Sequence, residues 1–351
     1  MMKHFKFYSK QDILSATKIR RFETKLGETL QYLKSDSSWT DELQKSSARY
    51  VLFGIPEDIG IRANHGKGDE YLAWFPFLSC FLNVQSNDFL TGESILLLGH
   101  FDFTDIKEVI ESNATTVDEK TEAYRHAVNW VDEEVENLVK MVTQFNKIPI
   151  IIGGGHNNSY PAIKGAAKGL LKAGHLPLAQ INCINLDSHT HYQPLEGRHS
   201  GNSFRYADED GYLNKYCVVG LHENYLPQNI WIDIMNNPFI DFISYEDIFI
   251  HDKKNFIQAV AYATGFTEET YTAIDVDLAC IQDALCSTSN PSGVSALHAR
   301  QFITFVATDS KVAYLHICEG SCVLNDGKTY ANKGKLISYL VSDFVKSHSA
   351  R

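Results

Sequence analysis

The sequence has few of the features that mark secreted, membrane-spanning or nucleic-acid-binding proteins. Its 351 residues contain no run of about eighteen apolar residues, and the first ten hold lysines but no apolar segment of roughly 7–15 residues. The net charge of −11 leaves no basic excess to attract a nucleic acid or an anionic membrane. We therefore expect a soluble, unsecreted, cytoplasmic protein without nucleic-acid or membrane partners.

The sequence also lacks the paired cysteine spacing of disulfide frameworks and zinc sites. The seven cysteines form no C-x-x-C pair, which is typical of reduced intracellular thiols rather than of disulfides. A thiolate zinc site stays open only if four of them converge, namely Cys280, Cys286, Cys318 and Cys322. The three glycines at 153–155 are not a phosphate loop, because no G-K-[ST] follows them.

Apolar runs of two kinds alternate along the chain. Apolar residues spaced by three and four predict an amphipathic helix over 118–144, which leads directly into an apolar, β-branched strand at 148–152. Such alternation is typical of a parallel, doubly wound sheet with helices on both faces. We predict an α/β fold that forms one domain over residues 1–351, with residues 1–48 as an N-terminal extension packed on it.

The other predicted elements continue this alternation. We expect helices at 161–172, 255–264, 299–308 and 333–348, and strands at 181–186, 217–221, 239–244, 270–276 and 311–317. The longest stretches without a pattern, 58–92 and 189–211, are predicted to be irregular and to carry substrate loops at strand ends.

Three apolar runs end abruptly in carboxylate or imidazole side chains. One is followed by Gly-Gly-Gly-His at 153–156, the second by Asp187, and the third by Asp275 and Asp277. Ligands gather at the carboxyl ends of parallel strands, so we expect these side chains to meet. Carboxylate oxygen with imidazole nitrogen suits Mn²⁺, Ni²⁺, Zn²⁺ or Fe²⁺ better than Ca²⁺ or a thiolate-bound metal. The pattern indicates a metallohydrolase, although each D-x-H or D-x-D is common by chance and acidic residues also cap helices.

The spacing within these runs allows two metal ions. Alternate residues of a strand point to the same side, which would direct Asp187, His189 and His191 into one cavity, and likewise Asp275 and Asp277. Carboxylates that bridge two cations hold them roughly 3.5–4 Å apart, and a water between the cations loses its proton near neutral pH. We therefore expect two divalent metal ions.

In this order the segments resemble the motifs of the ureohydrolase family, which comprises arginase, agmatinase and formimidoylglutamase. The family's G-G-[GD]-H, D-A-H-x-D and S-x-D-x-D motifs, which hold a binuclear Mn²⁺ site, match residues 153–156, 187–191 and 273–277. Residues 51–60 resemble the family's first strand and G-x-P-x-D-x-G loop, and residues 293–296 (G-V-S-A) resemble a formimidoylglutamase segment. The resemblance covers most of the chain and implies a three-layer arginase-like fold and Mn²⁺ as the favoured metal.

The resemblance also implies a ligand set. The first metal would bind His156, Asp187, His191 and Asp275, and the second would bind Asp187, His189, Asp275 and Asp277. The chain departs from the family at His191, where the family has Asp. A neutral nitrogen lowers the negative charge of the site by one, which moves the metal preference toward Ni²⁺, Zn²⁺ or Fe²⁺ or weakens that position.

Substrate-binding residues are implied at two further places. Ser200 and Asn202 stand where the family keeps S-G-N, and Glu319 stands at a last strand end whose Glu contacts the amidine or guanidine group. Arginases have a catalytic His where this chain has Phe204, whereas formimidoylglutamases similarly show an apolar residue followed by Arg. We therefore expect Asn202 and Arg205 to hold a substrate carboxylate, and the alternative is a solvated loop.

These observations predict a binuclear-metal hydrolase that cleaves a linear amidine C–N bond, with Asp277 and Glu319 as catalytic residues. The favoured reaction converts N-formimidoyl-L-glutamate to L-glutamate and formamide, by a homo-oligomer. Hydrolysis of a guanidino compound with release of urea stays open, as does a degenerate, non-catalytic ligand-binding member, because of His191. His199 and His222 are candidate proton shuttles, although a lone loop histidine is more often a surface residue.

Overall fold

One mixed sheet forms the centre of the computed structural model, which describes residues 3–34, 38–68, 73–283, 290–320 and 333–350. Nine strands of these residues follow the order β1-β3-β2-β4-β9-β8-β5-β6-β7. Neighbouring strands are parallel except for β1, which pairs with β3 in the antiparallel sense. The strands are β1 Phe5–Phe7, β2 Tyr50–Gly54, β3 Ile95–Phe101, β4 Ile148–Ile152, β5 Ile181–Leu186, β6 Leu213–Leu221, β7 Ile240–Ser244, β8 Tyr271–Asp277 and β9 Lys311–Cys318. The predicted mostly parallel α/β sheet is confirmed.

Helices alternate with the strands along the chain. The longest, α7, starts at a capping box in which Thr116 and Glu119 satisfy each other's backbone N–H groups, and its apolar residues face the core. Its bounds agree within one residue with the prediction. The helices are α1 Lys10–Ser15, α2 Leu26–Thr29, α3 Trp39–Lys45, α4 Ile59–Ala63, α5 Trp74–Phe81, α6 Thr104–Asn113, α7 Val117–Gln144, α8 Ser159–Lys172, α9 Ser203–Glu209, α10 Gln228–Asn236, α11 Tyr245–Phe249, α12 Phe256–Phe266, α13 Ala296–Asp309 and α14 Lys333–Ser349.

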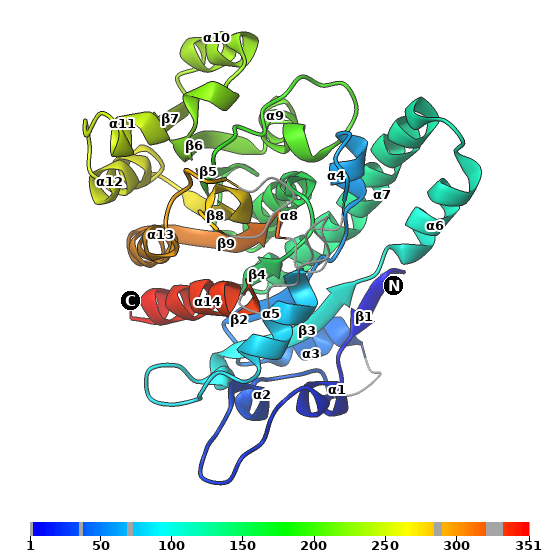
Figure 1. Ribbon diagram of the computed structural model, residues 1–351. Helices are drawn as coiled ribbons and strands as arrows, with labels where there is room; N and C mark the ends of the chain where they lie inside the picture. Colours follow the sequence, from blue (N-terminus) through cyan, green and yellow to red (C-terminus); the bar gives the residue numbers. More distant parts are fainter. Residues whose placement is uncertain (1–2, 35–37, 69–72, 284–289, 321–332, 351) are drawn as a thin grey trace.

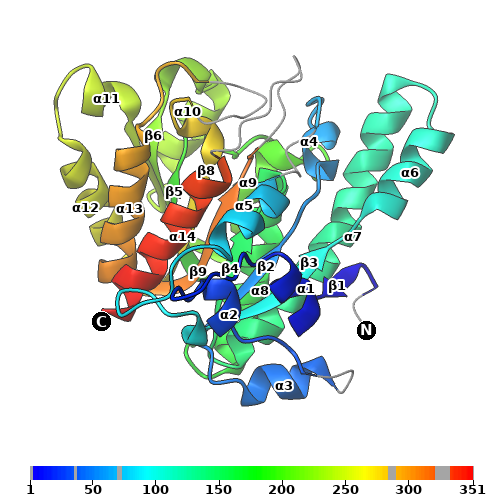
Figure 2. The same ribbon diagram turned by 60° about the horizontal axis from the view of Figure 1, so that its bottom comes forward.

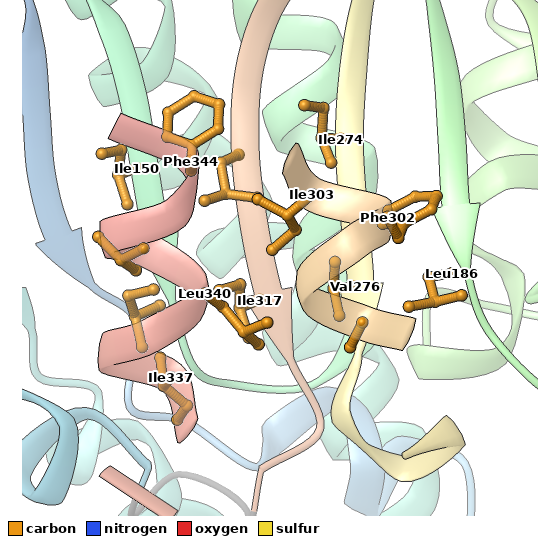
Figure 3. Close-up of a cluster of buried hydrophobic side chains, with 14 of the residues drawn as sticks. Ile150, Leu186, Ile274, Val276, Phe302, Ile303, Ile317, Ile337, Leu340 and Phe344 are labelled. Atoms are coloured by element: carbon orange, nitrogen blue, oxygen red, sulfur yellow. The ribbon is translucent and has the colours of Figure 1, made fainter. Parts of the chain in front are cut away.

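The helices cover both faces of the sheet, so the molecule has three layers. Helices α12, α13 and α14 lie along one face, and α7 and α8 lie on the other (Figures 1 and 2). Phe302 of α13 and Leu340 of α14 are fully buried against the face that α12, α13 and α14 cover (Figure 3). Strands covered on both sides are buried along their length: every residue of β5 is buried, including Asn182 and Asn185.

The prediction that residues 58–92 and 189–211 are irregular was wrong in part. The first stretch contains α4 and α5, and the second contains α9. Helix α5 is apolar nearly all round, so it lacks the spacing of three and four that marks an amphipathic helix. Both stretches nevertheless border the strand ends that carry the candidate site.

The N-terminal segment packs against the same sheet. Strand β1 extends its edge next to β3, and Gln31 bridges to Leu96 at the start of β3. The described residues contain no helix long and apolar enough to cross a membrane.

Candidate metal centre

The ends of neighbouring strands bring the candidate ligands together. Strands β4, β9, β8 and β5 lie side by side. Gly153 and Gly154 follow β4 with φ values of 94° and 77°, which favour glycine, and they turn the chain so that His156 starts a 3₁₀ turn (η3, His156–Asn158). Asp187 follows β5 directly, and Asp277 ends β8. Residues far apart in the sequence therefore meet at one edge of the sheet.

Four side chains present their donor atoms to a common point. The donor atoms of His156, Asp187, His191 and Asp277 all lie within 4.8 Å of one another. Nδ1 of His156 is 3.4 Å from Oδ2 of Asp187 and 3.3 Å from Oδ2 of Asp277. Nε2 of His191 is 3.2 Å and 3.3 Å from the same two oxygens. Two carboxylates and two imidazoles form a donor set that suits a borderline divalent metal.

Backbone N–H groups hold the two carboxylates in place. Oδ1 of Asp187 accepts the N–H of His189 (2.8 Å), and Oδ1 of Asp277 accepts the N–H of Ala279 (2.6 Å). The second oxygen of each carboxylate faces the two imidazoles. Burial acts to raise the pKa of Asp187, but His191 and the hydrogen bonds outweigh it and hold this pKa well below its usual range.

His191 reaches the common point through a strained backbone. Its φ is 43°, which is uncommon for a residue other than glycine and occurs mainly at functional sites. Its Nδ1 donates to the carbonyl oxygen of Ser200 (2.7 Å) when the ring is neutral. That tautomer leaves the lone pair of Nε2 pointing at Asp187 and Asp277.

Asp275 lies beside this point, and neighbours engage both of its oxygens. Ser159 Oγ donates to Oδ2 (2.7 Å), while Oδ1 lies 3.0 Å from Nδ1 of His316 and 3.3 Å from Nε2 of His156. Together with His156 and Cys318, Asp275 forms a second group of donors within 4.8 Å of one another. The structure therefore places Asp275 next to His156 but outside the group of four.

His189 is not brought to the common point. Strand β5 ends at Leu186, so the alternation expected from a strand does not extend through 187–191. The side chain of His189 is 41% exposed and stacks on the ring of Tyr225, with centroids 4.8 Å apart. Its Nδ1 lies 3.8 Å from Oδ1 of Asp187, so His189 borders the group of four without joining it.

Glu319 faces the site from the end of β9. Its φ is 57°, and its Oε1 accepts the backbone N–H of His156 (2.7 Å). Burial and the negative charge of Asp277 raise the pKa of Glu319 to about 8. A cationic group bound next to this carboxyl would favour its ionised form.

The predicted substrate-binding loop is largely bonded within the protein. The side chain of Asn202 accepts the N–H of His199 (3.1 Å) and donates to the carbonyl of Gly197 (2.7 Å). Arg205 pairs with Asp233 and lies 4.1 Å above the ring of Tyr192. The structure therefore brings the Ser200 carbonyl to His191, but it engages Asn202 and Arg205 with other protein groups.

Two histidines proposed as proton shuttles are poorly suited to that role. His199 is fully buried, and burial with Arg125 and Arg198 nearby lowers its pKa to about 3. His222 stacks against Tyr225 and Tyr245, and burial lowers its pKa too. Both rings therefore remain neutral near pH 7.

The thiolate zinc alternative receives no support from the described residues. Cys286 and Cys322 lie outside them. Cys280 and Cys318 belong to no common group of potential metal donors there.

Three buried charged residues near the site, Glu57, Asp132 and Arg198, were not singled out from the sequence. Glu57 accepts hydrogen bonds from Asn158 Nδ2 (2.6 Å) and from the N–H of Gly155 (3.2 Å), and so supports the turn that carries His156. Arg198 pairs with Asp132 of α7 (2.8 Å). A charged residue at the otherwise apolar positions of α7 was the available signal for Asp132.

The charge of the site fits a bound cation. Asp187, Asp275 and Asp277 are at most 1% exposed, and among the described residues their only ion-pair partners are histidines. Buried carboxylates are costly without a compensating positive charge. The buried Nε2 of His156 lies 3.3 Å from Oδ1 of Asp275 but makes no hydrogen bond of good geometry within the described part of the chain. A divalent metal would offset the excess negative charge with this donor set.

Comparison with known proteins identifies the family. The model of the arginase family matches residues 88–342, well over half of the chain. The chain belongs to the arginase family. This range contains every candidate ligand described above.

Formimidoylglutamases are among the relatives of this arginase-family chain. That of Streptococcus gordonii is 27% identical over 153 residues, covering 42% of this chain and 45% of the relative. That of Streptococcus pyogenes serotype M6 is 23% identical over 226 residues, covering 62% and 67%. The chain thus spans about 45% of the length of the first of these relatives in the matched region.

Solved structures share the arginase-family fold over nearly the whole chain. Formimidoylglutamase from Bacillus subtilis has a TM-score of 0.70 at 13% identity, covering 95% of this chain and 94% of that chain. A formiminoglutamase from Trypanosoma cruzi with Mn²⁺ has 0.68 at 19%, covering 94% and 99%. Proclavaminate amidino hydrolase from Streptomyces clavuligerus has 0.67 at 14%, covering 94% and 98%. The predicted three-layer arginase-like fold is confirmed.

Proposed function

We propose that this chain is a metal-dependent hydrolase of linear amidines, with N-formimidoyl-L-glutamate as the favoured substrate and L-glutamate and formamide as products. The observation that carries the proposal is the buried group of His156, Asp187, His191 and Asp277 at the strand ends of an arginase-family fold. The formimidoylglutamases among its relatives and structural neighbours support this choice of substrate.

The group of four would hold the first divalent metal, and Asp275 and His189 would contribute to a second. When bound, such a metal lowers the pKa of water and so supplies a hydroxide nucleophile near neutral pH. Mn²⁺ is the favoured metal, because a formiminoglutamase neighbour contains it, and Ni²⁺, Fe²⁺ or Zn²⁺ are alternatives because His191 adds a second nitrogen to the site. His189 lies outside the group of four, so the second position is the weaker one.

The carboxylates next to this group have separate roles. Glu319 is held by the N–H of His156, which directs the carboxylate toward a cationic amidinium that it would bind by charge-assisted hydrogen bonds. Asp277, whose Oδ1 is held by the N–H of Ala279, would take up the proton that the attacking water gives up and pass it to the leaving amine. Asp277 is buried and Glu319 is partly buried, which strengthens these interactions relative to those of groups in water.

The proposed substrate carboxylate would bind at the loop of Ser200, Asn202 and Arg205. Arg205 is the cationic member of this set, and its partners Asp233 and Glu209 have side chains that are 42% and 54% exposed. Ion pairs with exposed partners are weak, so a substrate carboxylate can compete for the guanidinium. A homo-oligomer, a cytoplasmic location and a single domain over residues 1–351 remain part of this proposal.

A guanidino-compound hydrolase that releases urea is the second candidate. The fold shared with proclavaminate amidino hydrolase and with agmatine ureohydrolase of Thermoplasma volcanium favours it. A non-catalytic ligand-binding protein is the third, since His191 differs from the expected Asp.

A substrate panel separates these functions. The full chain, stripped of metal and reloaded with Mn²⁺, is assayed on N-formimidoyl-L-glutamate, arginine and agmatine, with Asp187→Asn as the metal-site control. We expect formamide and glutamate from the first substrate and none from the control. Urea from a guanidino substrate would favour the second function. Metal binding without any turnover would favour the third.

A further inference from the structure

A single buried arginine joins three segments around the proposed site. Arg198 is 3% exposed, and its Nε and Nη2 donate to the two oxygens of Asp132 (2.8 and 3.2 Å). The rings of Tyr160 and Tyr206 lie 4.6 and 4.9 Å from the guanidinium carbon. Burying such a pair costs desolvation energy and is weak evidence for a role in stability alone. The other hydrogen bonds of Arg198 reach two segments that border the group of four.

One of these bonds reaches the segment that carries His156. Nη2 of Arg198 donates to the carbonyl oxygen of Asn157 (2.8 Å), the residue that follows His156 in η3. The same nitrogen donates to Asp132, so the guanidinium ties the turn of His156 to helix α7. Arg198 contacts the backbone at this place and does not contact the imidazole.

Another bond reaches the loop that orients His191. Nη1 of Arg198 donates to Oδ1 of Asn202 (3.0 Å). Asn202 in turn binds the N–H of His199 and the carbonyl of Gly197, which closes the loop around Ser200. The carbonyl of Ser200 accepts Nδ1–H of His191 (2.7 Å). This carbonyl fixes the tautomer that presents Nε2 of His191 to the metal.

We propose that Arg198 is a positioning residue of the metal site. Its planar guanidinium binds both oxygens of Asp132 on α7. Its other hydrogen bonds fix the Asn157 carbonyl and the Asn202 side chain in position relative to this helix. Arg198 thereby sets the orientation of both imidazoles of the group of four without binding metal or substrate. The inference rests on the proposed function, because it assigns these imidazoles to a metal.

Metal affinity is the readout that separates positioning from general stabilisation. Groups that orient metal ligands typically contribute about 10–100-fold to metal affinity. We expect Arg198→Met, titrated calorimetrically with Mn²⁺ as the metal-free full chain, to have a Kd about 10–100-fold weaker than wild type. Arg198→Lys keeps the charge but loses the fork, so its Kd should lie between the two.

Two control variants test whether the loss of any Arg–Asp pair, or any loss of stability, weakens metal binding. Arg300→Met breaks another two-bond Arg–Asp pair, with Asp343 (2.6 and 3.1 Å), between α13 and α14. Phe302→Ala lowers stability in the core on the α13 side of the sheet. Both should bind Mn²⁺ with the wild-type Kd.

The outcomes distinguish this inference from the proposed function. Wild-type protein that binds no metal would overturn the proposed function itself. Wild-type protein that binds Mn²⁺, together with an unchanged Kd in Arg198→Met, would overturn only the positioning role. If Arg198→Met does not fold, Arg198→Lys decides: a Kd equal to that of wild type overturns the proposal, and a weaker one supports it.

Discussion

Replacing His191 by aspartate probes the unusual ligand directly. Nε2 of His191 lies 3.2 Å from Oδ2 of Asp187 and 3.3 Å from Oδ2 of Asp277. Two like unit charges about 4 Å apart repel by about 4 kcal/mol at an effective dielectric constant of about 20. His191→Asp places a third carboxylate beside these two, and proton uptake relieves part of the repulsion. We therefore expect the metal-free variant to be about 2–4 kcal/mol less stable than wild type at pH 7.

Bound Mn²⁺ should reverse this loss, because the added carboxylate then becomes a ligand. A cation at 100 times its Kd stabilises the folded protein by about 2.7 kcal/mol. For a chain of this length, each kcal/mol shifts Tm by about 1–2 °C. We expect a rise in Tm of several degrees on adding Mn²⁺ to His191→Asp, larger than in wild type, and a metal preference shifted toward Mn²⁺.

Urea unfolding at pH 7, with a chelator or with Mn²⁺, gives the two free energies. The control is His100→Asp, which changes an 8% exposed imidazole on β3, two strands away from β4. This control should be destabilised equally with and without metal. The reasoning fails if metal-free His191→Asp is as stable as wild type and responds no more strongly to Mn²⁺.

Three further predictions test separate parts of the account. Arg205→Ala should lower kcat/KM for N-formimidoyl-L-glutamate by about 1.5–3 kcal/mol, whereas wild-type activity that is equal on agmatine, which has no carboxylate, would contradict this role. Burial and Lys6 lower the pKa of His100 to about 4, so the unfolded chain binds more protons than the folded one between pH 6.5 and 4, and the free energy of unfolding falls by up to about 3 kcal/mol as the pH drops over that range. His100→Phe should flatten this loss in urea titrations, and a pH profile parallel to that of wild type would refute the prediction. Phe302→Ala should lower the free energy of unfolding by about 3–5 kcal/mol, and Leu297→Ala, at a 62% exposed residue of the same helix, by less than about 0.5 kcal/mol. Similar losses in the two variants would contradict the packing of α13.

The elements with strong patterns could be predicted from the sequence, and weakly patterned ones could not. Helix α7 has apolar residues at three- and four-residue spacing over 28 residues, and β5 is an uninterrupted buried run. Strand β1 has only three residues and one buried side chain, so nothing local distinguishes it. Its position depends on pairing with β3, whose paired residues lie 92 to 96 positions further along the sequence.

The strand ends could be predicted as the place of the site, but the direction of each side chain could not. The alternation argument assumed that β5 continues to residue 191, and instead the chain turns after Leu186. His189 consequently points to Tyr225, while the positive φ of His191 brings its ring to Asp187. Arg198 was missed because its partner Asp132 lies on another element and no local pattern joins the two.

The metal content of wild type and Asp187→Ala tests the central claim most directly. Elemental analysis after dialysis against Mn²⁺ counts metal ions per chain. Asp187 belongs to the group of four, and the sequence predicts that it bridges both metal positions together with Asp275. We predict two divalent ions per wild-type chain, with the second bound more weakly, and none in Asp187→Ala. Full occupancy in Asp187→Ala, or a wild-type chain that retains no metal, would contradict the account.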